Sequence, residues 1–201
     1  MLVAGIGNVF LGDDAFGVEV AQRIAATPVP EGVEVLDVGI RGVHLAYQLM
    51  DGYDELLLVD AVSRGDAPGT VTVLEPNVDA LTPVPLDPHR LEPGPLLASV
   101  HALGAMPARV RLVGCEPADL GEGMGLSPTV ADAVEPAIVA VRRLIDEFVA
   151  RRSETRRPDP GKGDHEEEAV PARRAGPDRV RRLPPTPGHR AVPAHQADVR
   201  G

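Results

Sequence analysis

The stretch that decides the fold is residues 2–17, LVAGIGNVFLGDDAFG. Its first residues, 2–6, are apolar without alternation, which is typical of a strand that is covered on both faces. A loop follows, and Asp13 and Asp14 come before a run in which apolar residues recur with a helical period. The stretch therefore predicts a buried strand, a loop, and a helix that begins near Ala15 with carboxylates at its N-terminus, where they are favoured.

The rest of the chain continues the alternation of strands and helices. Further strands are predicted at residues 33–36, 56–59, 70–74 and 110–113, and further helices at residues 43–50, 96–103 and 129–150. The link between the third and fourth strands is too short for a crossover helix, so the fourth strand should run antiparallel to the third. This order predicts a three-layer α/β domain with a mostly parallel sheet.

Charge and proline divide the chain into two parts. Residues 1–150 hold 8 of the 20 basic residues and 22 of the 30 acidic residues, a net charge of −14. Residues 151–201 carry a net charge of +4 and 8 of the 21 prolines. A segment this charged and this poor in large apolar residues buries too little surface to offset the entropy lost on ordering. We therefore predict a folded domain over 1–150 and a disordered Pro/Arg-rich tail over 151–201.

The composition also excludes several classes of partner and location. The acidic domain lacks the clustered Lys and Arg that a nucleic-acid-binding surface requires. No apolar run approaches the roughly 20 residues of a membrane span, and no basic residue precedes the first apolar stretch as it would in a signal peptide. The chain has one cysteine, which agrees with a reducing compartment. These features predict a cytoplasmic protein that binds neither nucleic acid nor membrane.

The candidate chemistry lies at one edge of the predicted sheet. In open parallel sheets, ligands bind at the carboxyl ends of the strands, where the strand order reverses. If the first strand lies between the second and third, Asp13 and Asp14 follow one of the two strands that flank this point, and Asp60 ends the other. His89 lies in a Pro-rich loop over residues 75–95 that can fold over the same edge. Two carboxylates and one imidazole suit a divalent metal.

Each of these residues also has a purely structural interpretation. Asp14 is equally suited to capping a helix, Asp60 to binding loop amides after its strand, and His89 to a surface position. Cys115 follows a strand without a recognisable histidine base, which favours a buried thiol over a nucleophile. The Gly-x-Gly after the first strand lacks the third glycine of a dinucleotide-binding loop.

Residues 5–17, GIGNVFLGDDAFG, closely resemble the opening motif of the hydrogenase maturation proteases. The resemblance covers about residues 1–148 and continues through Leu58-Val59-Asp60-Ala61, Asp87-Pro88-His89, Leu112-Val113-Gly114-Cys115-Glu116-Pro117 and Gly125-Leu126-Ser127-Pro128-Thr129-Val130. These endopeptidases trim the C-terminus of the large subunit of nickel–iron hydrogenases and are commonly grouped with the aspartic type. The resemblance implies a three-layer α/β/α sandwich with a five-stranded, mostly parallel sheet and one antiparallel strand.

The resemblance also implies a site and a substrate. Asp14, Asp60 and His89 match the metal-binding trio of the family, and Asp14 and Asp60 are the expected catalytic residues, with their proton roles open. The nickel would belong to the substrate, a hydrogenase large-subunit precursor, so the protease would have no cofactor of its own. A non-catalytic nickel-sensing checkpoint or chaperone would need the same three ligands and is the alternative.

The chain departs from the family pattern at two places. Position 14 is Asp, whereas the family often has Glu, so the carboxylate is one methylene shorter. After the second strand, many members have Asp-Gly-Gly-Thr, whereas this chain has DVGIRG over residues 37–42. The resemblance implies that this loop selects the substrate, through Asp37, Gly39, Arg41 and Gly42.

Overall fold

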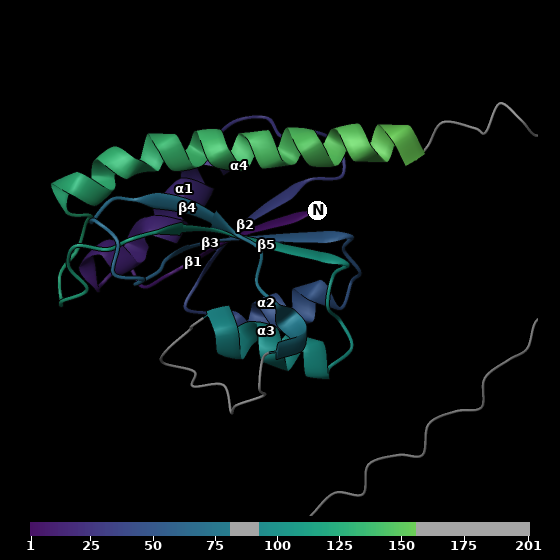
Figure 1. Cartoon of the computed structure of the whole chain (residues 1–201), viewed down its shortest axis with the longest axis horizontal. Helices are drawn as coiled ribbons and strands as arrows, with labels where there is room; N and C mark the ends of the chain where they lie inside the picture. The colour runs from purple at the N-terminus through teal and green to yellow at the C-terminus, as the bar shows by residue number, and fades with distance from the viewer. Residues whose placement is uncertain (81–92, 156–201) are drawn as a thin grey trace, which may run out of the picture. The chain divides into compact units, whose positions relative to one another are not determined.

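The computed structural model describes residues 1–80 and 93–155 (Figure 1). The strands are β1 (Leu2–Ile6), β2 (Glu34–Gly39), β3 (Glu55–Ala61), β4 (Val71–Leu74) and β5 (Arg109–Cys115). The α-helices are α1 (Phe16–Ala25), α2 (Gly42–Leu49), α3 (Pro93–Ala102) and α4 (Pro128–Thr155), with short 3-10 helices η1 (Gly12–Ala15) and η2 (Val78–Ala80). The strands and helices expected from the sequence are thus confirmed, with shifts of a few residues at their ends.

The five strands form one sheet in the order β2-β1-β3-β5-β4. The first four of these are parallel to one another, and β4 runs antiparallel to β5. The predicted direction of β4 is therefore right, although its neighbour in the sheet is β5 and not β3. The strand order reverses between β1 and β3, because the chain passes from β1 outward to β2 and then returns to β3. This is the point at which the sequence placed the candidate site.

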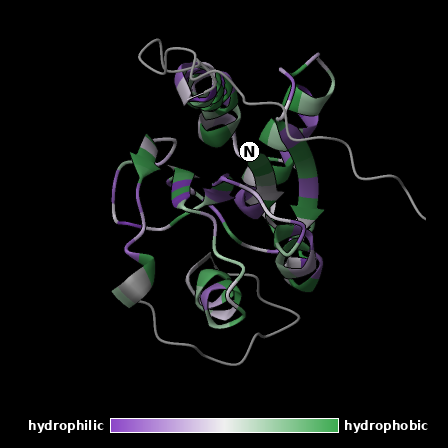
Figure 2. Cartoon of the chain, turned by 90° about the vertical axis from the view of Figure 1, so that its right-hand side faces the viewer, coloured by the Kyte–Doolittle hydropathy of each residue, from purple (hydrophilic) through white to green (hydrophobic). Residues whose placement is uncertain are grey.

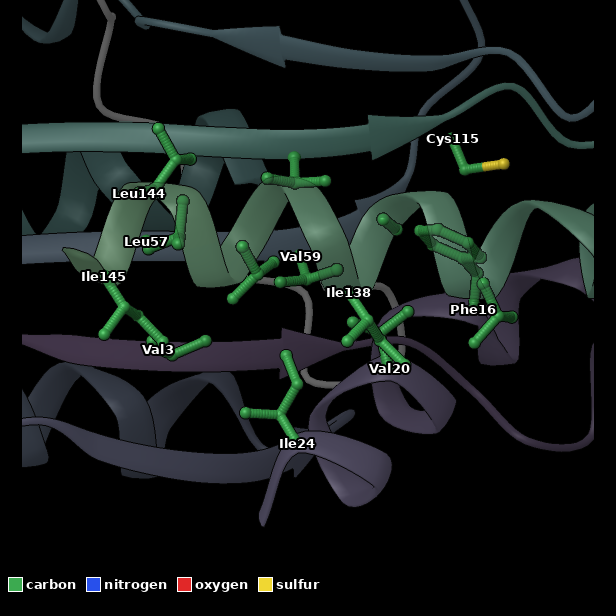
Figure 3. Packing of buried hydrophobic residues seen from close by; sticks show 14 of the residues in the cluster. Val3, Phe16, Val20, Ile24, Leu57, Val59, Cys115, Ile138, Leu144 and Ile145 are labelled. Carbon is green, nitrogen blue, oxygen red and sulfur yellow. The ribbon is translucent and has the colours of Figure 1, made fainter. Parts of the chain in front are cut away.

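Helices cover both faces of the sheet, with α1 and α4 on one face and α2 and α3 on the other (Figure 1). Alternate strand residues enter the two apolar clusters, so Val3 and Leu57 meet α1 and α4 while Leu2 and Leu56 meet α2 and α3. Figure 3 shows the first cluster between the sheet and α4. Hydrophobic and hydrophilic residues both occur around α4 (Figure 2), as expected of a helix that covers a sheet and faces water. The three-layer α/β/α architecture is confirmed.

Two glycines of the opening motif bring α1 close to the sheet. A Cβ atom on Gly17 would overlap the carbonyl oxygens of Ile6 and Val59, and a Cβ atom on Gly5 would overlap the Gly17 carbonyl and the Ala21 side chain. The first turn of α1 therefore lies directly on β1 and β3, at the end of the strands where their order reverses. Close helix–strand packing therefore explains Gly5 and Gly17, and Gly5 is the first glycine of the Gly-x-Gly considered above.

The final helix is longer than the sequence predicted. It runs to Thr155, whereas the folded domain was expected to end at residue 150. The additional turn is anchored because Arg151 Nη2 lies 2.6 Å from Glu55 Oε1, and Glu55 is buried at the start of β3. The helix therefore ends later than predicted, and the predicted division of the chain at residue 150 stays a prediction. The remainder of the predicted tail, residues 156–201, lies outside the described residues, so its predicted disorder stays a prediction.

Candidate active site

The carboxyl edge of the sheet gathers three loops that the sequence had singled out. The loop after β1 lies beside the loop after β2, because the Gly7 N–H donates to the Gly39 carbonyl at 3.2 Å. Gly5 in β1 is in register with Val59, the residue before Asp60 in β3. Asp14 and Asp60 therefore belong to neighbouring strand ends at the point of order reversal. His89, the third residue of the predicted trio, lies outside the described residues.

Asp14 lies in η1 and is half-buried. It does not cap α1, whose N-cap residue is Ala15 with no side-chain hydrogen bond, so the capping interpretation is wrong. Instead, its Oδ2 accepts the Asn8 N–H at 2.7 Å, and within the described residues its Oδ1 accepts no hydrogen bond. Burial raises the pKa of Asp14 above its ordinary value, and the hydrogen bond from Asn8 offsets only part of this rise. Asp14 thus keeps one oxygen for a ligand.

Asp60 occupies the penultimate position of β3 and is 3% exposed. Its Oδ1 accepts the N–H of the next residue, Ala61, at 2.9 Å, and because Ala61 still belongs to β3 the predicted binding of loop amides stays a prediction. That local bond does not exclude a second role for the carboxylate. A buried Asp at the carboxyl end of a central parallel strand has the position expected of a site residue.

Asp13, the neighbour of Asp14, has a structural role that the sequence did not reveal. Its fully buried carboxylate accepts the N–H of Ser127 at 2.6 Å on Oδ1. Its Oδ2 accepts the N–H groups of Ala118 and Asp119 at 2.8 and 2.9 Å and the Ser127 hydroxyl at 2.9 Å. Burial alone would raise the pKa of Asp13, but these hydrogen bonds outweigh it and hold the pKa below its ordinary value. Asp13 therefore ties the loop after β5 to η1.

Glu116 organises a second loop at this edge. It follows β5 directly and is buried, and its carboxylate accepts the Arg64 N–H at 2.7 Å and the Gly65 N–H at 3.2 Å. These backbone hydrogen bonds are the largest cause of the lowered pKa of Glu116. Since an ionised carboxylate that is saturated by amides is a poor base, Glu116 is a loop anchor.

The predicted substrate-selecting loop is held mainly by its own side chains. The Asp37 carboxylate accepts the Gln22 side-chain amide at 2.8 Å, and the Arg41 guanidinium donates to the carbonyls of Val38 and Asp37 at 3.2 and 3.0 Å. Gly39 has a φ of +55°, a conformation that favours glycine. Gly42, the fourth residue of this prediction, is buried at the start of α2. The loop lies at the site edge, beside the loop after β1, and its role in selection stays a prediction.

Cys115 is not a nucleophile. It is fully buried in the apolar cluster beneath α1 and α4 (Figure 3). Burial, with the nearby charges of Asp13 and Glu116, raises the pKa of the Cys115 thiol to about 11. The thiol therefore stays protonated at neutral pH, and the predicted buried thiol is confirmed.

A resident metal site is not formed by the described part of the chain alone. Among residues 1–80 and 93–155, no three His, Cys, Asp or Glu side chains gather as metal ligands. Two of the three predicted ligands, Asp14 and Asp60, are described and belong to the same edge. Over the same residues, no helix is long and apolar enough to cross a membrane.

The folded part of the chain is similar to proteins of one known family. The family model described as hydrogenase maturation protease matches residues 18–143, well over half of the chain. The chain belongs to the hydrogenase maturation protease family. It is 36% identical to the hydrogenase 2 maturation protease of Escherichia coli K12 over 150 residues, which cover 73% of this chain and 91% of that protein. It is also 36% identical to the hydrogenase expression/formation protein HupD of Rhodobacter capsulatus, over 72% of this chain and 70% of that protein.

Solved structures agree with the placement of this hydrogenase maturation protease in its family. The hydrogenase maturating endopeptidase HybD of E. coli matches with a TM-score of 0.64 and 35% identity, over 73% of this chain and 92% of that chain. The solution structure of an endopeptidase from E. coli matches with a TM-score of 0.61 and 30% identity, over 74% and 94%. The E. coli relatives are named as a maturation protease and as endopeptidases, which supports a peptidase over the alternative of a non-catalytic checkpoint or chaperone.

Proposed function

We propose that this protein is the endopeptidase that removes the C-terminal extension of a nickel–iron hydrogenase large-subunit precursor after nickel insertion. The observation that carries the proposal is the different use of two adjacent carboxylates. Asp13 is saturated by hydrogen bonds, whereas Asp14 keeps Oδ1 without one among the described residues. Asp14 also belongs to the strand end beside that of Asp60, at the reversal of strand order, where α/β proteins bind their ligands.

The nickel ion in this proposal is part of the substrate. Asp14, Asp60 and His89 would complete the ligand shell of a metal that the precursor already holds, and the protease would have no cofactor of its own. Two carboxylates and one imidazole, without a thiolate, form a borderline ligand set with open positions that the ligands of the precursor can fill. Recognition of inserted nickel would then place the precursor chain at the two carboxylates.

Hydrolysis in this proposal uses Asp14 and Asp60 as the proton-handling groups. Their carboxylates would activate a water molecule as general bases and return a proton to the leaving amine. The raised pKa of Asp14 suits such a group, because a pKa above that of an exposed Asp lies closer to the working pH. This scheme agrees with the aspartic-type grouping of the family, although the chain has no Asp-Thr-Gly or Asp-Ser-Gly motif. A cytoplasmic location and the substrate-selecting role of residues 37–42 belong to the same proposal.

The test compares single variants on one purified, nickel-loaded precursor. Asp14→Asn, Asp60→Asn and His89→Ala should each lose at least 100-fold in cleavage rate and keep the wild-type melting temperature within a few degrees. Asp132→Asn, an exposed position on α4, is the matched control and should cleave at the wild-type rate. Wild-type cleavage by Asp14→Asn or Asp60→Asn would refute the assignment. Loss of cleavage with retained binding of the precursor would separate a catalytic role from a purely structural one.

A further inference from the structure

Two loops beside Asp14 display apolar side chains to the solvent. One loop joins β1 to η1 and the other follows β5. The exposed members are Val9 (38%), Phe10 (64%), Leu120 (45%) and Met124 (78%). A single exposed apolar residue is ordinary, but a highly exposed Phe and Met on loops at the edge of an active site indicate a binding surface.

The two loops are fixed to each other by backbone hydrogen bonds. The Gly123 N–H donates to the Phe10 carbonyl at 2.9 Å, and the Gly12 N–H donates to the Gly123 carbonyl at 3.0 Å. The Asp13 N–H donates to the Asp119 carbonyl at 2.9 Å, in addition to the hydrogen bonds that the Asp13 carboxylate accepts from this loop. Phe10 and Met124 therefore lie on a preformed surface, so little conformational entropy would be lost in ordering these loops when a partner binds.

The charged side chains of the two loops themselves have one sign. Residues 1–22 and 112–141 contain no Lys or Arg. Asp119 and Glu122 are exposed in the loop that carries Met124. The surface is also continuous with the candidate site, because the Asp14 N–H donates to the Leu11 carbonyl at 3.1 Å, one residue beyond Phe10. Its partner should therefore combine apolar side chains with at least one basic side chain, and it should lie next to the reacting bond.

We propose that Phe10, Met124 and Glu122 form a docking surface for a segment of the precursor that flanks the scissile bond and carries apolar and basic side chains. This inference rests on the proposed function and adds to it the place and chemistry of substrate recognition. Phe10 and Met124 are the anchors, since aromatic and flexible thioether side chains bind apolar segments well. Glu122 orients the basic side chain.

The experiment measures kcat and KM for cleavage of the nickel-loaded precursor, and its binding, with the full chain. Phe10→Ala/Met124→Ala should raise KM at least 10-fold and leave kcat within 3-fold, because the anchors contact the substrate away from the reacting atoms. Glu122→Gln should raise KM about 3-fold at low salt and less at high salt, because exposed charges are screened. Tyr47→Ala/Met50→Ala is the matched control, an equally exposed aromatic–Met pair on and just after α2.

The outcomes separate the docking surface from the proposed function. A rise in KM for Phe10→Ala/Met124→Ala that is at least five times the rise for the control supports the surface. An equal or smaller rise, with normal cleavage by the wild-type protein, contradicts the surface and leaves the function intact. Binding without cleavage by the wild-type protein contradicts the function, and the same comparison of variants is then made on Kd. A wild-type protein that neither binds nor cleaves the precursor contradicts both.

Discussion

Replacing Asp13 with Asn should unfold the protein more easily, whereas replacing Asp14 with Asn should stop catalysis. In the wild-type protein, Asp13 accepts three backbone N–H groups and one hydroxyl. Hydrogen bonds to a charged group contribute about 1.5–3 kcal/mol each. An Asn side chain can still accept through one oxygen, but its NH₂ group would face N–H donors on the other side.

The oxygen of an Asn side chain still accepts part of these hydrogen bonds, so only part of this stabilisation is lost. We therefore expect a loss of about 3 kcal/mol in the free energy of unfolding, which is roughly 10 °C in melting temperature for a domain of this size. Asp14→Asn removes the charge from an oxygen that accepts only the Asn8 N–H, and it should cost about 1 kcal/mol or less.

The assay is urea unfolding of both variants at pH 7, with precursor cleavage measured on the same samples. The pKa of Asp13 lies below its ordinary value of 3.8, so its stabilisation is fully present above that pH and is lost as the pH falls through the folded-state pKa. Between pH 7 and pH 3, the difference in stability between wild type and Asp13→Asn should therefore shrink only at the acid end. A destabilisation of Asp14→Asn equal to or larger than that of Asp13→Asn would refute the division of roles.

Three further perturbations test the packing around the site. Gly17→Ala should destabilise the fold by about 2–3 kcal/mol in thermal melts, because its Cβ would overlap strand carbonyls. Gly94→Ala, whose Cβ would meet open space, should be neutral or slightly stabilising. Native Cys115, with a pKa of about 11, should resist iodoacetamide at pH 8 and react only after unfolding, and Cys115→Ala should keep activity. Arg111→Ala should lower the free energy of unfolding by about 3 kcal/mol, because buried Glu55 loses the guanidinium that lies 3.1 Å from its carboxylate. The kcat/KM of the folded fraction should stay unchanged, because this pair lies at the opposite end of the strands from the site.

The sequence predicted the layers and the position of the site because both depend on local patterns. Apolar runs and helical periods identified the strands and helices, and the short link after β3 gave the direction of β4. The insertion of β5 between β3 and β4 could not be predicted, since it depends on pairing between distant segments. The end of α4 was also missed, because its last turn is held by a contact between Arg151 and Glu55, 96 residues apart.

The roles of Asp13 and Asp14 show the same limit at the level of single residues. Both are carboxylates in one motif, and their spacing alone does not show which of them is saturated by structural hydrogen bonds. The decisive partners of Asp13 are amides of a loop more than 100 residues away. Ser127, which directly precedes α4, is the one signal that the sequence offers, and a serine at that place indicates no more than a helix start.

In the proposed function, cleavage depends on nickel carried by the precursor. The most direct measurement incubates one chelator-treated preparation of the protease with nickel-loaded and nickel-free precursor and follows the shortening of the large subunit. We predict complete processing of the nickel-loaded precursor, no processing of the nickel-free form, and no effect of the earlier chelation. Equal cleavage of the two precursors would contradict the claim, and loss of activity after chelation would instead indicate a metal ion that belongs to the protease.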